Sequence, residues 1–430
     1  MSQTASPPAR AEAPASSGPA RAVGRGAFAA APWRLLALAD RPLLAAAVAL
    51  VVYAAFAFWH GDPHGRSPFP YYGYLADAFL HGQTSLRLPP PDTHDLSVFQ
   101  GKLYLYWFPF PALLFLPFVA LFGVGFSDVA FTVVLGAVNV ALVAVLLRAA
   151  VSARWIRLDR VRRGVLVTCF ALGTVHLTLA PFGRVWFTGQ LVGFAAVALG
   201  YLAALRLQGR LGALATGLAF SAALATRSHL LLAGVWPAWV LLSKERTPAR
   251  RLAVLASGLT PVVATLALLA VYDQARFGAP LETGIRFHRM GSVFVEAFAR
   301  HGAFSLHYLP RNFFYEFLTY PLVPGLESLQ GGGLFWMTPV FLAAFWARRG
   351  RPGSRRALVL SCVLTAIPIL LVMGTGYVQW GPRYTLDFTV PLLLLTAMGL
   401  SRWPPRRIAV TLGLSLAIYL SGAGYLALYL

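Results

Sequence analysis

Residues 60–107 read HGDPHGRSPFPYYGYLADAFLHGQTSLRLPPPDTHDLSVFQGKLYLYW and form the first long polar interruption in a mostly apolar chain. The stretch holds four of the nine histidines, which are His60, His64, His81 and His94. It also holds four carboxylates, which are Asp62, Asp77, Asp92 and Asp95. A membrane interior excludes so many charges, and a solvated loop has no need of so many aromatic rings. We therefore expect a folded cap at a membrane surface, where chemistry is to be sought first.

The composition of the whole chain indicates a membrane protein. Of 430 residues, 58% are hydrophobic and only 12% are charged, with a mean hydropathy of +0.65. A soluble domain could not keep that much apolar surface away from water. Alternating strands separated by regularly spaced turns are missing, which argues against an outer-membrane barrel. The sequence predicts an all-α polytopic membrane protein with an outer-face cap of interfacial helices.

The order of apolar and polar segments predicts one domain that follows a tail. Residues 1–33 are rich in Ala, Pro, Ser and Arg without periodicity, and we expect a disordered cytoplasmic tail there. Residues 34–430 are expected to form a single domain. We predict about eleven transmembrane helices in it, at residues 42–59, 128–147, 164–181, 189–205, 211–227, 229–243, 252–272, 333–347, 357–374, 388–402 and 408–428.

The apolar run at 108–126 is long enough to span a membrane but is expected not to do so. It contains Pro109, Pro111 and Pro117, which suit a surface-lying or re-entrant helix. A basic stretch follows at 148–163, and the positive-inside rule favours a cytoplasmic place for it. That place requires 108–126 to stay at the outer interface.

The net charge of +21 then reports orientation. With the N-terminus in the cytoplasm, most Lys and Arg fall in short inner loops. Two long outer segments remain, a first outer loop or cap at 60–126 and a second outer loop at 273–332. The charge is interpreted as contact with anionic lipid, and no nucleic acid is expected as a partner. The chain is predicted to be a multi-pass protein of the cell inner (plasma) membrane.

Three carboxylates of the cap are candidates for a general base. Residues 71–83 read as a short helix that places Asp77 and His81 on one face, where the histidine could tune the carboxylate. Asp62 follows the first spanning helix closely and would lie near lipid headgroups. Asp95 follows a run of prolines and is less easily explained by turn chemistry than Asp92. For Asp62 and Asp77, an ordinary charge at a helix end or polar helix face remains an equal alternative.

The segment at 377–388, YVQWGPRYTLDF, lies between two predicted spans at the outer face. An arginine at that depth is costly to leave unpaired, and a guanidinium suits a phosphate group. Arg383 with Tyr384 is therefore predicted to bind substrate. Further outer-edge cations could complete a phosphate or pyrophosphate pocket, and these are Arg184, Arg227 and Lys102. Taken singly, each could instead be an interfacial residue that reaches the headgroups.

No metal site or cofactor is predicted. His60, His64 and His94 with nearby aspartates could bind a divalent metal, but their spacing matches no standard ligand pattern. The sequence contains no Walker loop, dinucleotide fingerprint, nucleophile elbow or HExxH motif. The inner loops are short and basic, which disfavours a cytoplasmic nucleotide site.

Three stretches together resemble the C-type superfamily of integral-membrane glycosyltransferases. They are YYGYLADAFLHG at 71–82, PFPALLFLPFVALFG at 109–123 and WGPRYTLDFTVPLLLL at 380–395. The superfamily includes protein O-mannosyltransferases and aminoarabinose transferases that use polyprenyl-phosphate sugars. The resemblance implies a cytoplasmic N-terminus, a long first outer loop with surface helices, and an acidic base soon after the first helix. These motifs cover about a tenth of the chain.

One departure from that family bears on the base. Many members carry an Asp–Glu pair just before the tyrosines, where this chain has Ser67–Pro68–Phe69–Pro70. The base would then be Asp62, Asp77 or Asp95. The resemblance implies transfer of a sugar from a polyprenyl-phosphate donor to an acceptor glycan, lipid or protein at the outer face of the bilayer. A lipid-linked saccharide transporter or an inactive membrane scaffold is the alternative.

Overall fold

The computed structural model describes residues 31–60, 64–319, 330–348, 351–376 and 379–429. Nearly all of its regular structure is helical, and the chain is an all-α membrane protein. Within the described ranges, six helices are long and apolar enough to cross a membrane. They are α2 (Pro42–His60), α5 (Asp128–Ser152), α7 (Val185–Arg206), α10 (Pro248–Phe277), α14 (Ser354–Leu371) and α16 (Pro405–Tyr429).

The predicted count of eleven spans is not confirmed. The run at 164–181 is divided between α6 (Arg160–Leu172) and the 3-10 helix η3 (Val175–Thr178). The run at 229–243 is divided between η4 (Ser228–Gly234) and α9 (Val235–Ser243). The runs at 211–227, 333–347 and 388–402 give α8 (Gly209–Leu224), α13 (Leu334–Met337) with η8 (Pro339–Trp346), and α15 (Thr389–Leu400). The helices in these runs end or begin at Gly173, Gly234 and Pro339, since Gly favours helix ends and Pro lacks the N–H that a helix interior needs.

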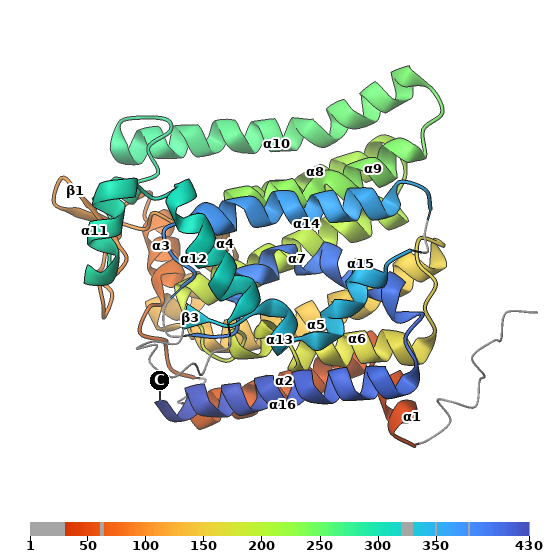
Figure 1. Cartoon of the computed structure of the whole chain (residues 1–430). Coiled ribbons are helices and arrows are strands. Elements are labelled where there is room, and N and C mark those ends of the chain that lie inside the picture. The colour runs from red at the N-terminus through yellow and green to blue at the C-terminus, as the bar shows by residue number, and fades with distance from the viewer. Residues whose placement is uncertain (1–30, 61–63, 320–329, 349–350, 377–378, 430) are drawn as a thin grey trace, which may run out of the picture.

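The long helices run roughly side by side (Figure 1). Successive packing partners are α2 with α5, α5 with α7, α7 with α8, and α8 with α10. The α8–α10 contact is close at Gly217, where a Cβ would lie 2.2 Å from the carbonyl oxygen of Gly258. A residue without a side chain is needed there for the two backbones to approach.

The two ends of the bundle differ. The N-terminal helix α1 (Ala31–Leu38) lies at one end, and α3 (Tyr71–Leu80), β1 (Ser97–Phe99) and α11 (Ser292–His301) gather at the other (Figure 1). Residues 1–30 of the predicted disordered tail lie outside the described residues. Residues 31–33, which the sequence analysis placed in the tail, are the first residues of α1 in the structure.

The cap contains short helices in the segments where the sequence predicted them. Helix α3 ends just before Gly82, which has a φ of 68°. The proline-bearing run forms α4 (Phe110–Phe122), followed by η2 (Gly123–Gly125), and α4 packs against α3. A hairpin of β1 and β2 (Lys102–Tyr104) lies between them, with Ser97 paired to Tyr104. With 13 residues, α4 is shorter than the six membrane-length helices.

The segment predicted as a second outer loop joins the first one to make one cap. It contains η5 (Ile285–Phe287), α11, η6 (Leu306–Tyr308), α12 (Leu309–Phe313) and the π-helix η7 (Phe314–Leu318). The backbone N–H of Asp95 donates to the carbonyl oxygen of Arg289 at 3.0 Å, and that of Arg289 donates to Leu96 at 2.9 Å. The backbones of Ser97 and His288 form an isolated antiparallel β-bridge. A short parallel pair, β3 (Gln330–Gly331) with β4 (Gln379–Trp380), links the end of this loop to the segment before α15.

Candidate functional site

Three arginines predicted to bind phosphate come together at the cap end of α7. Arg184 immediately precedes α7, Arg227 immediately precedes η4, and Arg383 begins the 3-10 helix η9 (Arg383–Phe388). The three segments are neighbours because α7 packs against both η4 and η9, which also contact each other. The fold thus assembles residues that are up to two hundred positions apart in the sequence.

Two aromatic rings connect the arginines. The guanidinium carbon of Arg383 lies 4.7 Å from the ring centroid of Tyr384, and that of Arg227 lies 5.3 Å from the same ring. The Phe187 ring is shared in the same way, at 5.9 Å from both Arg184 and Arg383. Aromatic faces attract cations, so these rings help to hold positive groups close together.

Asp387 neutralises one of the three arginines. Its Oδ2 accepts from Nη2 of Arg227 at 3.0 Å and lies 2.7 Å from Nε2 of His229. Burial acts to raise the pKa of Asp387, but the charge of Arg227 and the hydrogen bond from His229 outweigh it and hold the pKa below its ordinary value. Asp387 is therefore an ionised carboxylate, and its second oxygen, Oδ1, has no hydrogen-bond partner.

The other two arginines are not matched by ionised carboxylates. Arg383 is 7% exposed and donates one hydrogen bond, from Nη2 to the hydroxyl of Tyr384 at 3.1 Å, while its buried Nε has no partner. Within the described ranges, Arg184 makes no hydrogen bond or ion pair. Burial, and then the charge of Arg383, lower the pKa of Arg184. Three arginines thus face one ionised aspartate, which leaves two positive charges unbalanced and suited to an anion.

Glu316 of η7 is the second carboxyl group beside this cluster. It is 1% exposed, and neither carboxyl oxygen has a hydrogen-bond partner. The pKa of Glu316 is raised to about 8, chiefly by burial. The charge of Arg383 opposes this shift, and the charge of Asp387 adds to it. Glu316 is therefore mostly protonated at neutral pH. Single turns of π-helix often occur at functional positions, which agrees with a role for Glu316.

Asp95 lies in a hydrogen-bonded group where the two outer loops meet. Its Oδ1 is 2.9 Å from Nε2 of His288 and 3.4 Å from Nε2 of His94, and its Oδ2 accepts from Nε1 of Trp186 at 3.1 Å. The residue adopts a left-handed φ of 63°, which costs energy in a non-glycine residue and is fixed by the link to Arg289. Asp95 is thus oriented by three side chains and keeps 16% of its own side chain exposed.

Tyr106 packs against His288, the histidine that contacts Asp95. Its ring centroid is 4.5 Å from that of His288. Burial raises the pKa of its hydroxyl well above the ordinary value, Asp95 and Tyr384 raise it further, and Arg383 lowers it. Both Asp95 and Arg383 are therefore within electrostatic range of this one hydroxyl.

Asp77 and His81 have other partners. Asp77 accepts two hydrogen bonds from Arg87, from Nε to Oδ2 and from Nη2 to Oδ1, both at 3.0 Å. The carboxylate raises the pKa of Arg87. His81 Nδ1 is 2.8 Å from the backbone oxygen of Asp77 and 3.7 Å from its Oδ1. These contacts tie the end of α3 to the following loop.

Lys102, which the sequence predicted to complete the phosphate pocket, is exposed on β2. Among the described residues, no contact joins it to the arginine cluster. Asp62 lies outside the described residues. The histidines considered as metal ligands, His60, His64 and His94, form no group of three metal-binding side chains in the part of the chain that is described.

Ser67, which stands where the resembled family often has an Asp–Glu pair, is hydrogen-bonded to the start of α5. The backbone N–H of Ser67 donates to Oδ1 of Asp128 at 2.8 Å, and its hydroxyl donates to Oδ2 at 2.5 Å. Ser127 also donates, from its hydroxyl to the carbonyl oxygen of Gly65 at 2.6 Å. Residues 65–67 are therefore hydrogen-bonded to the start of α5.

Sequence reasoning missed several residues of the site. They are Asp387, His229, Glu316, His288, Trp186 and Tyr106. One signal was available, because Asp387 and His229 stand only four and two positions after Arg383 and Arg227. An arginine near a membrane calls for a carboxylate partner. His288 and Glu316 could not be connected to the first loop without the tertiary structure.

Comparisons with known proteins find structural neighbours but no sequence relatives. No protein-family model and no curated protein matches the chain. ArnT from Cupriavidus metallidurans, solved bound to undecaprenyl phosphate, is 17% identical with a TM-score of 0.49, over 89% of this chain and 62% of that one. The oligosaccharyltransferase of Archaeoglobus fulgidus in its apo form is 12% identical with a TM-score of 0.46, over 90% of this chain and 55% of that one.

A further structure is the archaeal oligosaccharyltransferase AglB from Archaeoglobus fulgidus with an inhibitory peptide and a dolichol-phosphate. It is 12% identical with a TM-score of 0.45, over 90% of this chain and 55% of that one. This chain spans about three fifths of ArnT and about half of the archaeal enzyme. The resemblance to membrane glycosyltransferases stated from the sequence is found again among these structures. At TM-scores below 0.5 it assigns neither the site nor the activity, which are argued from this chain's own residues.

Proposed function

We propose that this protein transfers a sugar from a polyprenyl-phosphate donor to an acceptor at the outer face of the inner membrane. The observation that carries the proposal is the pair Arg184 and Arg383. They are two largely buried cations in mutual repulsion, bridged by the Phe187 ring and not neutralised by an ionised carboxylate in the described chain. Such a place favours a phosphate, which would relieve the repulsion.

The charge change of the reaction fits this cluster. In the donor, the phosphate links the sugar and the lipid and carries one negative charge. When the bond between the anomeric carbon and the phosphate oxygen breaks, the electron pair stays with the phosphate, whose charge approaches two. Arg383 and Arg184 would bind this growing charge more strongly than the starting one, and such differential binding accelerates a reaction.

The acceptor would be activated by a carboxylate of the cap, and Asp95 is the candidate that the contacts favour. Its carboxylate would take the proton of an acceptor hydroxyl while the acceptor oxygen forms the new bond to the anomeric carbon. His288 and Trp186 hold the carboxylate in place. The hydroxyl of Tyr106 is within electrostatic range of both Asp95, the proposed base, and Arg383, the proposed phosphate ligand. Asp62 and Asp77 stay as candidates for this role, the second with both oxygens already bound by Arg87.

The orientation is part of the proposal. Loops at the end of the bundle opposite the cap carry most of the basic residues, and the positive-inside rule places such loops in the cytoplasm. The cap would then face outward. The polyprenyl tail would remain in the bilayer while its phosphate reaches Arg383, Arg227 and Tyr384, and Arg184 would complete the contact.

The test is sugar transfer in proteoliposomes. A panel of polyprenyl-phosphate sugars with labelled sugar is incorporated with the wild type, with Arg383→Ala, or with the matched control Arg300→Ala. Arg300 is 69% exposed and pairs with Glu296, away from the cluster. We expect wild type and control to release polyprenyl phosphate and transfer the label, and Arg383→Ala to lose this. Movement of intact donor between leaflets without cleavage would identify a transporter, and neither activity with any donor would identify a scaffold.

A further inference from the structure

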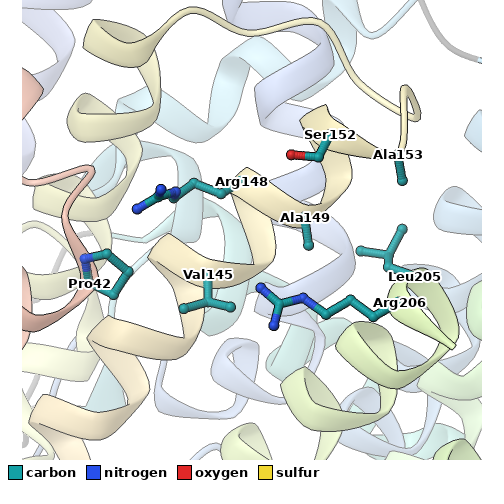
Figure 2. A pocket seen from close by; sticks show the side chains of 8 residues that line it. All are labelled: Pro42, Val145, Arg148, Ala149, Ser152, Ala153, Leu205 and Arg206. Atoms are coloured by element: carbon teal, nitrogen blue, oxygen red, sulfur yellow. The ribbon is translucent and has the colours of Figure 1, made fainter.

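A hollow of about 450 Å³ lies at the end of the bundle opposite the cap. It is formed by the first residue of α2, the last two turns of α5 and the last residues of α7. Its lining residues are Pro42, Val145, Arg148, Ala149, Ser152, Ala153, Leu205 and Arg206 (Figure 2). Arg148 and Arg206 come from neighbouring helices and flank Val145 in this view.

The hollow carries two positive charges and no negative one. Neither Arg148 nor Arg206 makes a hydrogen bond or ion pair within the described residues, and none of the lining residues is acidic. The nearest carboxylates along the chain are already engaged, because Asp40 pairs with Arg163 at 2.8 Å and Asp159 with Arg162. The two guanidinium groups and the hydroxyl of Ser152 therefore remain as donors for a ligand with anionic oxygens.

The position of the hollow along the helices indicates the depth of a lipid headgroup. Three membrane-length helices end at it, since α2 begins at Pro42, α5 ends at Ser152 and α7 ends at Arg206. Apolar side chains lead away from it toward the bilayer. Leu199 is 49% exposed and lies two turns before Arg206 on the same face of α7, and Leu43 is 85% exposed beside Pro42.

We propose that this hollow binds the phosphate headgroup of an anionic glycerophospholipid. Two guanidinium groups on adjacent helices can each offer paired N–H donors to phosphate oxygens, while the acyl chains would cover the exposed apolar faces. A soluble phosphate would leave those faces unused. The site is separate from the donor site, because the arginine cluster lies at the cap end and this hollow at the end near α1. The lipid would fasten the ends of α2, α5 and α7 together.

The test compares lipid retention by variants that lose the same charge. Wild type, Arg148→Gln/Arg206→Gln, Arg148→Lys/Arg206→Lys and the control Arg210→Gln/Arg250→Gln are purified in mild detergent. Each is titrated with phosphatidylglycerol, phosphatidylcholine or inorganic phosphate. All four arginines are exposed and lie at the same end of the chain's helices, but the control pair does not line the hollow. Native mass spectrometry counts bound lipid, and the unfolding temperature reports stabilisation.

We expect wild type and control to retain phosphatidylglycerol and to be stabilised by it. The Arg148→Gln/Arg206→Gln variant should bind it at least tenfold more weakly, and Arg148→Lys/Arg206→Lys should recover part of the binding. Equal retention by the hollow and control variants would overturn the proposal and leave only general attraction to a basic surface. Equal stabilisation by inorganic phosphate or by phosphatidylcholine would overturn the lipid assignment. Sugar transfer is not a readout here, so failure of the proposed activity would not affect the outcome.

Discussion

Arg227 and Asp387 form an ion pair of 3.0 Å between Nη2 and Oδ2, in which the Asp387 side chain is only 1% exposed. The pair joins η4 to η9 and brings the Tyr384 ring against Arg227. His229 shares the same carboxylate oxygen. This arrangement makes Arg227 chiefly an organiser of the site, while Arg383 and Arg184 remain available to a ligand.

Breaking this pair should destabilise the protein. Asp387→Asn leaves the guanidinium of Arg227 buried without a counter-charge, which costs about 3–5 kcal/mol at such positions. Arg227→Gln leaves the opposite charge unpaired. In the double variant neither charge is left alone, so its loss should be smaller than the sum of the two single losses. Unfolding temperatures in detergent give the comparison, and additive losses would contradict a coupled pair.

Replacement of Arg383 tests the phosphate contact. Arg383→Ala should slow transfer by a factor that corresponds to about 2–4 kcal/mol, the usual effect of removing a donor to developing charge. Arg383→Lys keeps the charge but loses the planar fork of donors. Its initial rate should therefore fall between those of wild type and Arg383→Ala. The rates are measured at matched protein levels in membranes. Equal rates for wild type and Arg383→Lys would make this residue an interfacial anchor.

Substitutions of the three candidate cap carboxylates should differ in their effect on the rate of sugar transfer. Asp95→Asn should lower transfer by about 10²–10⁴-fold while the protein remains folded, because the carboxylate would no longer accept the acceptor's proton. Asp77→Asn should mainly loosen the contact with Arg87 and leave the rate close to wild type. Asp62→Asn is measured as well, because Asp62 is the third candidate base. Full activity in Asp95→Asn combined with loss in Asp62→Asn or Asp77→Asn would move the base to that residue.

Glu316 should make stability depend on pH in the opposite sense from a salt-bridged carboxylate. Its pKa in the fold is about 8, above the ordinary 4.5, so between these values the unfolded chain ionises while the folded protein keeps the proton. The contribution of Glu316 to the free energy of unfolding is therefore greatest below about pH 4.5 and declines as pH rises to about 8. Glu316→Gln removes this dependence.

Unfolding temperatures of wild type and Glu316→Gln between pH 5 and pH 8.5 test this expectation. The difference between the two proteins should widen in favour of the glutamine variant as pH rises. A constant difference would show that Glu316 does not change its protonation on folding in this range.

Topology is tested with reporter tags. Tags after Arg160 and Lys244 should report the cytoplasm, because both positions lie in basic loops. Tags near Gln83 and Glu296, in the first and second outer loops, should report the outer side. A cytoplasmic signal near Gln83 would invert the proposed orientation and place the arginine cluster on the inner face.

The sequence by itself determined the kind of protein and the outline of the cap. Its apolar runs predicted the membrane-length helices, because a helix is the structure that satisfies backbone hydrogen bonds in lipid. Local patterns predicted a short helix within residues 71–83, where the structure has Tyr71–Leu80. They also set apart the proline-bearing run at 108–126, where the structure has Phe110–Phe122. The same patterns singled out Arg184, Arg227 and Arg383, since charge near an apolar run is costly without a purpose.

Only the tertiary structure decided which of these residues act together. Arg227 and Asp387 meet because α7 packs against both η4 and η9, a contact that no local pattern encodes. Asp95 contacts His288 because the second of the two predicted outer loops folds onto the first. Asp77 instead accepts hydrogen bonds from Arg87, which lies in the loop that follows α3. The predicted count of eleven spans is not confirmed, because hydropathy does not show where a run ends in short helices, as at Gly173, Gly234 and Pro339. Hydropathy and periodicity are properties of neighbouring residues, whereas ion pairing, burial and pKa depend on groups that folding brings together.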